Sequence, residues 1–317
     1  MDAVIAWVDS TSSSWRNSYG IHKSEAPFFG LNEARFRNNG ELKYLLRSIE
    51  LNMQFVDNIY IVTAGEAPDF VDFTHERIHL ITHEEIAPVG CLLPTFSSDV
   101  IETFIHNIKG LSSDFLYFND DFLVLNPVSK EFFIDSNCYW INQDLPVLNR
   151  IEVPNNPWER KLCNTRDRLS SWVNQDITLM TVPHTPRLLR KSIYSKILEM
   201  VKEDIGYLRS KRFRDDEREL QFQTFYNSMV VNCESIRDEF EIKVCSRRLD
   251  RSNSISLHIR DSVEDFISQI SLIDEFSPQF ICIQDEMDGH VAHSDPRLEA
   301  YHAYMNKLFP VKATFER

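Results

Sequence analysis

Two adjacent acids between apolar segments are the clearest chemical signal in this sequence. Asn119, Asp120 and Asp121 separate the apolar runs FLYF (115–118) and FLVL (122–125). Neighbouring carboxylates in such a setting repel each other and lose hydration unless a cation or a turn toward solvent relieves them. Their oxygens suit Mg²⁺ or Mn²⁺, usually together with a substrate phosphate. The motif therefore predicts metal binding by Asp120 and Asp121, and the alternative is an Asn-Asp turn that caps two strands.

Acids also follow three other apolar segments of the first half of the chain. Asp9 follows VIAWV, Glu66 follows IYIVTAG, and Glu84 and Glu85 follow IHLITH. In open parallel sheets, ligands bind at the carboxyl ends of the strands. We therefore expect carboxylates from four strand ends to meet at one rim of a sheet and to hold a cation there.

The local charge reverses between Arg187 and Arg214. Nine basic residues accompany three acids in this span, although the whole chain has a net charge of −14. A solvated helix face is the usual fate of such a run. A basic stretch in an acidic chain also suits a polyanionic ligand such as a pyrophosphate. Arg212 and Arg214 directly precede a predicted helix, so their guanidinium groups could reach phosphate oxygens.

One histidine and one glutamate are further candidates for catalysis. His184 lies between two prolines, which stiffen the backbone around it. An imidazole held in place suits a general acid or base near neutral pH, although an ordinary loop histidine is the commoner outcome. Glu102 and His106 are four residues apart on a predicted helix over 98–109 and would share one face. For this pair the sequence favours a solvated contact over a position at the rim.

Alternating apolar and helical patterns must position these residues. Strands are expected at 4–8, 58–63, 78–82, 115–118 and 280–283, and helices at 41–52, 98–109, 187–205, 217–230 and 297–308. This alternation predicts an α/β fold with a mostly parallel sheet that helices cover on both faces. Thr82 and Glu85 have the spacing of a capping box, and Gly110 and Gly206 are expected to end helices.

Composition limits the domain organisation and the possible ligands. The chain has 317 residues, of which 43% are hydrophobic and 26% charged, so it can bury a sizeable core. We expect one catalytic domain over 1–317, with a turn-rich insertion or flap at 142–180. The acidic balance lacks the basic footprint of a nucleic-acid-binding protein. Eight glycines and the absence of a G-x-x-x-x-G-K-[ST] or G-x-G-x-x-G motif exclude a glycine-rich phosphate cradle.

The N-terminal segment, the length of the apolar runs and the cysteine spacing bear on the location of the protein. The N-terminus carries no basic segment ahead of a long apolar one, and no apolar run approaches the ~20 residues of a membrane helix. These features predict a cytoplasmic protein with at most peripheral membrane contact. Six widely spaced cysteines without a C-x-x-C pair predict free, mostly buried thiols in a reducing compartment.

Four blocks of this sequence resemble the Stealth proteins. This family of sugar-phosphate transferases includes bacterial capsule and exopolysaccharide phosphotransferases and the catalytic subunit of the animal N-acetylglucosamine-1-phosphotransferase. The blocks are DAVIAWVD (2–9); RFRNNGELKY (35–44) followed by IYIVTAGE, ITHEEI, LPTFSSDVIETFIHNI and YFNDD; PHTP (183–186) with RFR (212–214) and ELQF (219–222); and FICIQD (280–285) with the terminal segment 309–316. Ser10 departs from the pattern, since many members have glycine there.

The resemblance implies a fold, a reaction and a set of site residues. The fold would be a Rossmann-like, GT-A-like fold of the nucleotide-sugar transferases. The functional positions of the family fall on Glu102, Asp121, His184 and Arg214. We expect Asp9, Asn38, Asn39 and Arg212 to bind the nucleotide sugar, and Asp120 and Asp121 to bind Mg²⁺ or Mn²⁺.

The expected reaction is the transfer of a hexose-1-phosphate to a glycan. The donor would be a nucleoside diphosphate sugar, such as a UDP-N-acetylhexosamine, and the acceptor would be a hydroxyl of a capsular or extracellular polysaccharide. A phosphodiester forms and a nucleoside monophosphate leaves. The alternative is a metal-dependent glycosyltransferase on the same type of fold, which would release a nucleoside diphosphate.

Overall fold

A five-stranded sheet forms the centre of the protein, with the strand order β3-β2-β1-β4-β8. It is seen in a computed structural model that describes residues 1–27, 33–136, 138–143, 154, 156–173, 177, 179–214, 218–292 and 294–317. The parallel strands are β1 (Asp2–Ala6), β2 (Ile59–Thr63), β3 (Ile78–Thr82) and β4 (Asp114–Asn119), with β8 (Arg187–Arg190) antiparallel at the edge. The predicted α/β class with a mostly parallel sheet is confirmed.

Two smaller sheets extend this core. One has the order β10-β11-β5 and the other the order β6-β7-β9. Their strands are β5 (Phe122–Val124), β6 (Ile134–Asp135), β7 (Cys138–Gln143), β9 (Lys243–Arg248), β10 (Ser254–Ile259) and β11 (Phe280–Asp285). Strand β11 runs antiparallel to β5, with Cys282 opposite Phe122. This pairing brings the C-terminal part of the chain beside the Asp120-Asp121 turn.

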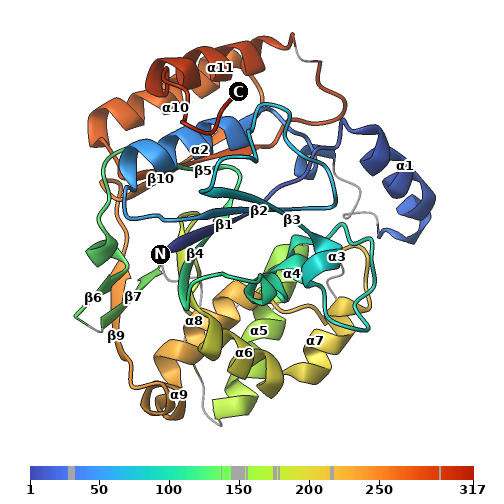
Figure 1. Cartoon of the computed structure of the whole chain (residues 1–317), viewed down its shortest axis with the longest axis vertical. Coiled ribbons are helices and arrows are strands. Elements are labelled where there is room, and N and C mark those ends of the chain that lie inside the picture. Colours follow the sequence, from blue (N-terminus) through green and yellow to red (C-terminus); the bar gives the residue numbers. More distant parts are fainter. Residues whose placement is uncertain are drawn as a thin grey trace.

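Helices cover both faces of the central sheet (Figure 1). One side carries α2 (Glu41–Asn52), α10 (Val263–Phe276) and α11 (Pro296–Leu308). The other side carries α5 (Pro157–Val173), α6 (Lys191–Met200), α7 (Lys202–Arg209), α8 (Phe222–Asn232) and α9 (Glu234–Glu239). The shorter α1 (Ser13–His22), α3 (His83–Ile86) and α4 (Ser98–Glu102) lie toward the carboxyl end of β1. None of the described helices has the length and apolar character needed to cross a membrane.

Several sequence predictions of local structure are confirmed. The helix over 41–52 and the strand over 78–82 have the predicted bounds. Thr82 and Glu85 form the expected capping box at the start of α3. The last helix begins one residue before the predicted range, at Pro296, where Asp295 caps it.

Other helix predictions are wrong, and tertiary contacts explain why. The predicted helix over 98–109 breaks after Glu102, because the Thr103 carbonyl accepts a 2.7 Å hydrogen bond from Arg209. Residues 105–107 form a separate 3₁₀ turn. Residues 187–190, expected in a helix, instead form β8, which satisfies the otherwise open edge of β4.

Two more helix boundaries differ from the prediction. Gly206, expected to end a helix, lies inside α7. The helix predicted over 217–230 begins at Phe222, where the Gln221 side chain caps it. Residues 215–217 lie outside the described part of the chain.

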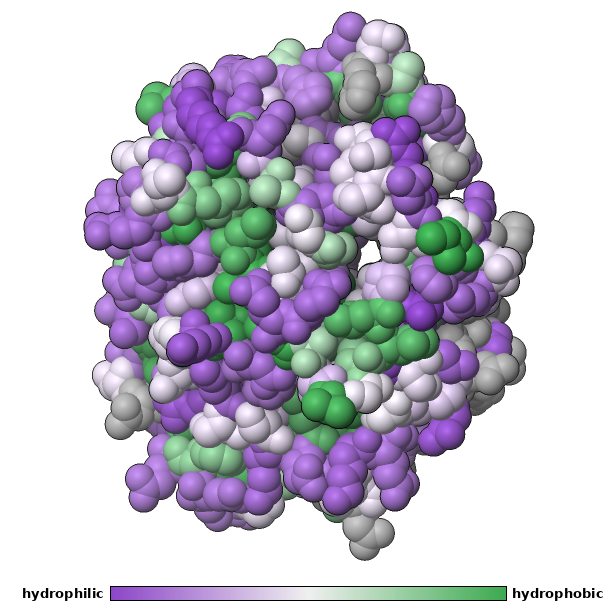
Figure 2. All heavy atoms as spheres, turned by 45° about the vertical axis from the view of Figure 1, so that its right-hand side comes forward, coloured by the Kyte–Doolittle hydropathy of each residue, from purple (hydrophilic) through white to green (hydrophobic). Residues whose placement is uncertain are grey.

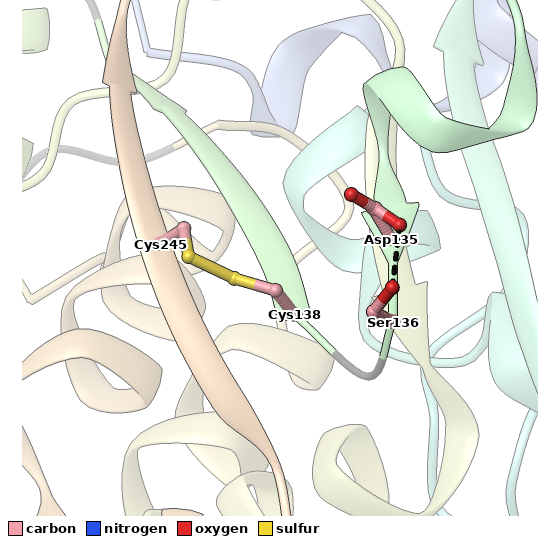
Figure 3. The surroundings of a disulfide bond; sticks show 4 residues. All are labelled: Asp135, Ser136, Cys138 and Cys245. Atoms are coloured by element: carbon pink, nitrogen blue, oxygen red, sulfur yellow. Dashed lines mark hydrogen bonds between the residues drawn. A yellow bond between two sulfur atoms is a disulfide. The ribbon is translucent and has the colours of Figure 1, made fainter.

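The prediction that all six cysteines are free is also wrong. Cys138 and Cys245 form a disulfide between β7 and β9, with a Cα–Cα distance of 6.1 Å (Figure 3). These strands are parallel neighbours, so residues 107 positions apart in the sequence come together. Cys91, Cys163, Cys233 and Cys282 are free.

The segment 142–180, predicted as an insertion or flap, is described only in part. Its described residues include α5, which packs on α8 and has buried Leu162 and Leu169 side chains. Thr165 Oγ1 accepts a 2.9 Å hydrogen bond from the backbone N–H of Gln221, just before α8. The prediction of a flap extends over residues 144–153, 155, 174–176 and 178, which lie outside the described residues.

An ion pair buried beneath α2 attaches the C-terminal end to the core. Arg47 donates hydrogen bonds of 2.6 and 2.7 Å to the two carboxylate oxygens of Glu316. It donates a third, of 2.8 Å, to the Phe309 carbonyl. Both charged side chains are almost inaccessible, at 6% and 2% of their surface. Because both groups have lost hydration, each depends on the other.

We predict that Arg47→Ala lowers the free energy of unfolding by about 3–5 kcal/mol, since Glu316 would remain buried without its partner. Urea denaturation measures this change. Lys202→Ala is the control, because its 3.1 Å pair with Glu199 is exposed and is worth at most about 1 kcal/mol. Equal losses in the two variants would contradict the role given to the buried pair.

Candidate functional site

A cavity of about 440 Å³ opens at the carboxyl ends of β1 and β4. Figure 2 turns this side of the molecule forward and shows an opening in its surface. Predicted site residues that line the cavity are Glu102, Asp120, Asp121, His184 and Arg214. Further charged or polar lining residues are Arg35, Arg37, Glu41, Asp99, Lys161, Arg187, Gln284 and Asp285. The structure thus brings together residues that are far apart in the sequence.

Asp120 and Asp121 form the turn between β4 and β5. Loss of hydration raises the pKa of Asp121 to about 6. The pKa of Asp120 is raised well above its usual range, first by burial and then by the charges of Glu41 and Asp121. Asp121 Oδ1 is buried without a hydrogen-bond partner, while Oδ2 accepts a 3.2 Å hydrogen bond from the Cys282 thiol. Among the residues that the structure describes, no basic side chain forms an ion pair with either acid.

Glu41, the first residue of α2, adds a third carboxyl to this end of the cavity. Its Oε2 accepts a 2.7 Å hydrogen bond from the Asn39 backbone N–H, yet burial still raises its pKa to about 7. Glu41, Asp120 and Asp121 are thus buried carboxyl groups with raised pKa values, and Asp121 Oδ1 has no hydrogen-bond partner. A bound cation would stabilise the ionised form of these groups.

A complete metal cage is nevertheless absent. Among the residues that the structure describes, no three His, Cys, Asp or Glu side chains are grouped so that they could hold a metal ion. Mg²⁺ often binds through one or two carboxylates and completes its shell with water and phosphate oxygens. Asp120 and Asp121 fit that pattern, in which the ligand supplies part of the coordination.

Glu102 lies at the end of α4, on another wall of the cavity. Burial raises the pKa of its carboxyl to about 7, and the charge of Arg187 opposes this shift. The expected pairing with His106 on one helix face does not form, since the helix ends between them. A carboxyl that titrates near neutral pH is suited to proton transfer.

His184 is held by strand β11. Its Nδ1 lies 2.7 Å from the Gln284 side-chain amide and 3.5 Å from Cys282 Sγ. The ring also lies over Phe122, with 5.9 Å between ring centroids. In this arrangement the Gln284 amide N–H donates to Nδ1, and a base that acts through Nε2 requires the amide to present its oxygen to Nδ1–H instead.

Arg214 is positioned by Asp99 and Ser98 of α4. Its Nε lies 3.2 Å from Asp99 Oδ2, and its Nη2 donates to Ser98 Oγ. Lys161 of α5 approaches the same Asp99 oxygen at 2.6 Å. Burial alone would raise the pKa of Asp99, but Lys161 and then Arg214 lower it below its usual value. Asp99 therefore remains ionised and orients two cations at the cavity wall.

The remaining predicted binding residues do not line the cavity. Asp9 accepts hydrogen bonds from Thr11 in a turn, and Asn38 accepts one from the Gly40 backbone. Asn39 is buried and donates a 2.9 Å hydrogen bond to Asp285. It therefore contacts a residue that lines the cavity without lining the cavity itself. The Arg212 guanidinium binds the Pro94 carbonyl at 2.8 Å and lies 3.2 Å from Glu25.

The expected ring of acids from four strand ends is wrong. Only the acids after β4 reach the cavity. Glu66 accepts a hydrogen bond of 2.9 Å from Ser14, and Glu85 completes the capping box of α3. The cavity's other carboxylates come from helices and from β11, because side chains on these elements also point toward the end of the sheet.

The site residues that the sequence did not predict include Arg187, Cys282 and Gln284. All three lie inside blocks that were noted for other reasons. Arg187 begins the basic run three residues after His184, and Cys282 and Gln284 alternate along FICIQD. No local signal marks them, since only the pairing of β11 with β5 places that strand beside His184.

Comparison with known proteins supports the resemblance seen in the sequence motifs. Residues 35–141 match the family model described as Stealth protein CR2, conserved region 2. The chain is 25% identical over 321 residues to the capsular polysaccharide phosphotransferase SacB of Neisseria meningitidis serogroup A, covering 100% of this chain and 57% of that protein. It is 27% identical over 332 residues to the exopolysaccharide phosphotransferase SCO2592 of Streptomyces coelicolor, covering 100% of this chain and 33% of that protein.

This chain therefore spans from a third to little more than half of these relatives. Among solved structures, the galactosyltransferase LgtC is similar, with a TM-score of 0.47 and 11% identity, covering 99% of this chain and 97% of that one.

We predict that Glu102→Gln changes the pH dependence of stability. The folded protein keeps a proton on Glu102 up to a pKa of about 7, whereas the unfolded chain releases it near 4.5. The stability contributed by this group is therefore present below pH 4.5 and is lost as the pH rises through 7. The glutamine variant should match the wild type at pH 4 and exceed it by about 1–3 kcal/mol at pH 8.

Urea denaturation at the two pH values measures this difference. Glu84→Gln is the matched control, because Glu84 is exposed. A stability difference between the glutamine variant and the wild type that is the same at pH 4 and pH 8 would contradict the buried, protonated state of Glu102.

Proposed function

Because this chain is a Stealth protein, we propose that it transfers a hexose-1-phosphate from a nucleoside diphosphate sugar to a hydroxyl of an acceptor glycan, during the synthesis of a capsule or exopolysaccharide. The supporting observation is one cavity that combines unneutralised acids, arginines and a positioned histidine. The proposed donor is a UDP-N-acetylhexosamine. The proposed partners are that donor and a polysaccharide acceptor.

The proposed reaction forms one P–O bond and breaks another. The acceptor hydroxyl attacks the phosphorus that bears the sugar and loses its proton to a base. The bond between this phosphorus and the oxygen of the nucleoside monophosphate breaks, so a phosphodiester and a nucleoside monophosphate result. Such transfers depend on positioning and on neutralisation of charge more than on covalent participation by the protein.

Asp120 and Asp121 would hold Mg²⁺ or Mn²⁺. When bound, the metal neutralises charge on the pyrophosphate as a Lewis acid. The orphaned Oδ1 of Asp121 and the raised pKa values of both acids support this assignment. Asp99 keeps Arg214 directed at the cavity, where the guanidinium can bind phosphate oxygens.

His184 is the proposed proton acceptor for the hydroxyl. Gln284 lies 2.7 Å from its Nδ1 and fixes the orientation of the ring, which lines the cavity. Glu102 is the alternative base, since its pKa of about 7 also permits proton transfer near neutral pH. Both side chains line the same cavity.

Identification of the released nucleotide tests the proposed reaction. The protein is incubated with Mg²⁺, with UDP-, GDP- or CDP-sugars and with short glycan acceptors, and the nucleotide product is identified by chromatography. We expect a nucleoside monophosphate that appears only when metal and acceptor are both present. Release of a nucleoside diphosphate would instead establish glycosyl transfer. Omission of the acceptor and addition of EDTA are the controls.

We predict that His184→Ala lowers kcat by about 10²–10⁴-fold, because a general base has been removed. The rate of monophosphate release measures the loss, and circular dichroism checks the fold. His290→Ala is the control, since His290 is exposed and does not line the cavity. Near wild-type turnover of His184→Ala would pass the role of base to Glu102.

A further inference from the structure

The basic side chains that line the cavity differ in how they are neutralised. They are Arg35, Arg37, Lys161, Arg187 and Arg214. Arg37, Lys161 and Arg214 each lie within 3.2 Å of a carboxylate oxygen, so their charges are already paired. Arg35 keeps an exposed surface, although partial burial and then the charge of Arg214 lower the pKa of its guanidinium to about 10. Arg187 is partly buried and forms neither an ion pair nor a hydrogen bond through its guanidinium with any residue that the structure describes.

Aromatic rings hold the Arg187 guanidinium in place instead. Its Cζ lies 5.5 Å from the centroid of the Phe122 ring and 5.9 Å from that of the Tyr117 ring. Its Nε is buried without a hydrogen-bond partner. The backbone is fixed as well, because Arg187 pairs with Tyr117 across β8 and β4. Ring faces attract a cation but leave its N–H groups unused.

Arg187 also lies near Glu102 and Asp121, two buried acids of the cavity. Its positive charge lowers the pKa values of both Glu102 and Asp121, against the larger effect of burial. Neither carboxylate lies within ion-pair distance of it, since no such pair occurs among the described residues. A partly buried cation whose donors are unused is costly unless a ligand supplies the acceptors.

We propose that Arg187 binds the phosphate group that is transferred. This assignment rests on the proposed function for the identity of the phosphate, whereas the binding of an anion follows from the geometry alone. A guanidinium offers parallel N–H donors that match two oxygens of a phosphate. Arg187 stands three residues after His184, so the same segment would carry the phosphate ligand and the proposed base.

Calorimetric titration with inorganic pyrophosphate and with UDP-N-acetylglucosamine, each with Mg²⁺, tests this role. We expect Arg187→Gln to weaken the binding of both probes by about 10–100-fold, as for the loss of a hydrogen bond to a charged group. Arg187→Lys keeps the charge without the fork and should lie between. Lys196→Gln removes the same charge outside the cavity, where Lys196 pairs with the exposed Glu239, and should bind like the wild type.

A second measurement separates binding from a structural role. Added guanidinium chloride at low millimolar concentration should partly restore the turnover of Arg187→Ala, and the urea midpoints of the Arg187 variants should match the wild type. Binding of both probes by Arg187→Gln at wild-type affinity would overturn the proposal, as would equal weakening in Lys196→Gln. Release of a nucleoside diphosphate by the wild type, with weakened binding in Arg187→Gln, would contradict phosphate transfer and still support this anion site.

Discussion

The removal of carboxylates from water at the end of β4 is the constraint on which this site depends. Asp120 and Asp121 occupy a two-residue turn between buried strands, and Glu41 at the start of α2 adds a third acid. Burial raises the pKa values of all three, so the protein alone does not stabilise their charged forms. This arrangement lowers stability in the absence of a ligand. A bound cation would neutralise the three carboxylates, and an anionic substrate would neutralise the remaining positive charge. The two ligands together would therefore offset the loss of stability.

Asp99, another buried acid of this cavity, has a lowered pKa. Asp99 is also buried, but Lys161 and Arg214 lie close enough to lower its pKa. It serves as an anchor that fixes the positions of cations. The cavity thus separates acids that are paired within the protein from acids that await a partner, and the difference arises from distance to the nearest basic group. Among the described cavity residues, Asp121 and Arg187 each keep a buried polar atom without a hydrogen-bond partner, so both retain capacity to bind.

Local patterns predicted the parts of the structure that local interactions determine. The period of apolar residues predicted α2, and the run IHLIT predicted β3 with its capping box. The Asn-Asp-Asp turn could be found because acids stand out between apolar strands. By contrast, β8 was expected to be helical, since nothing in Arg187–Arg190 reveals the open edge of β4 with which it pairs. The disulfide between Cys138 and Cys245 escaped notice for the same reason, as a strand pairing across 107 residues brings them together.

Long-range pairing also explains why the site residues occur in separate blocks of sequence. Gln284 and Cys282 reach His184 only because β11 pairs with β5, directly after the Asp120-Asp121 turn. Asp285, one residue further, accepts 2.6 and 2.7 Å hydrogen bonds from Arg37 and so joins the loop before α2 to β11. An imidazole aligned by one strand and a carboxylate pair carried by its neighbour cannot be moved independently. The distance between the proposed base and the proposed metal ligands is therefore set by strand pairing, which is far stiffer than a loop and suits a transfer that depends on alignment.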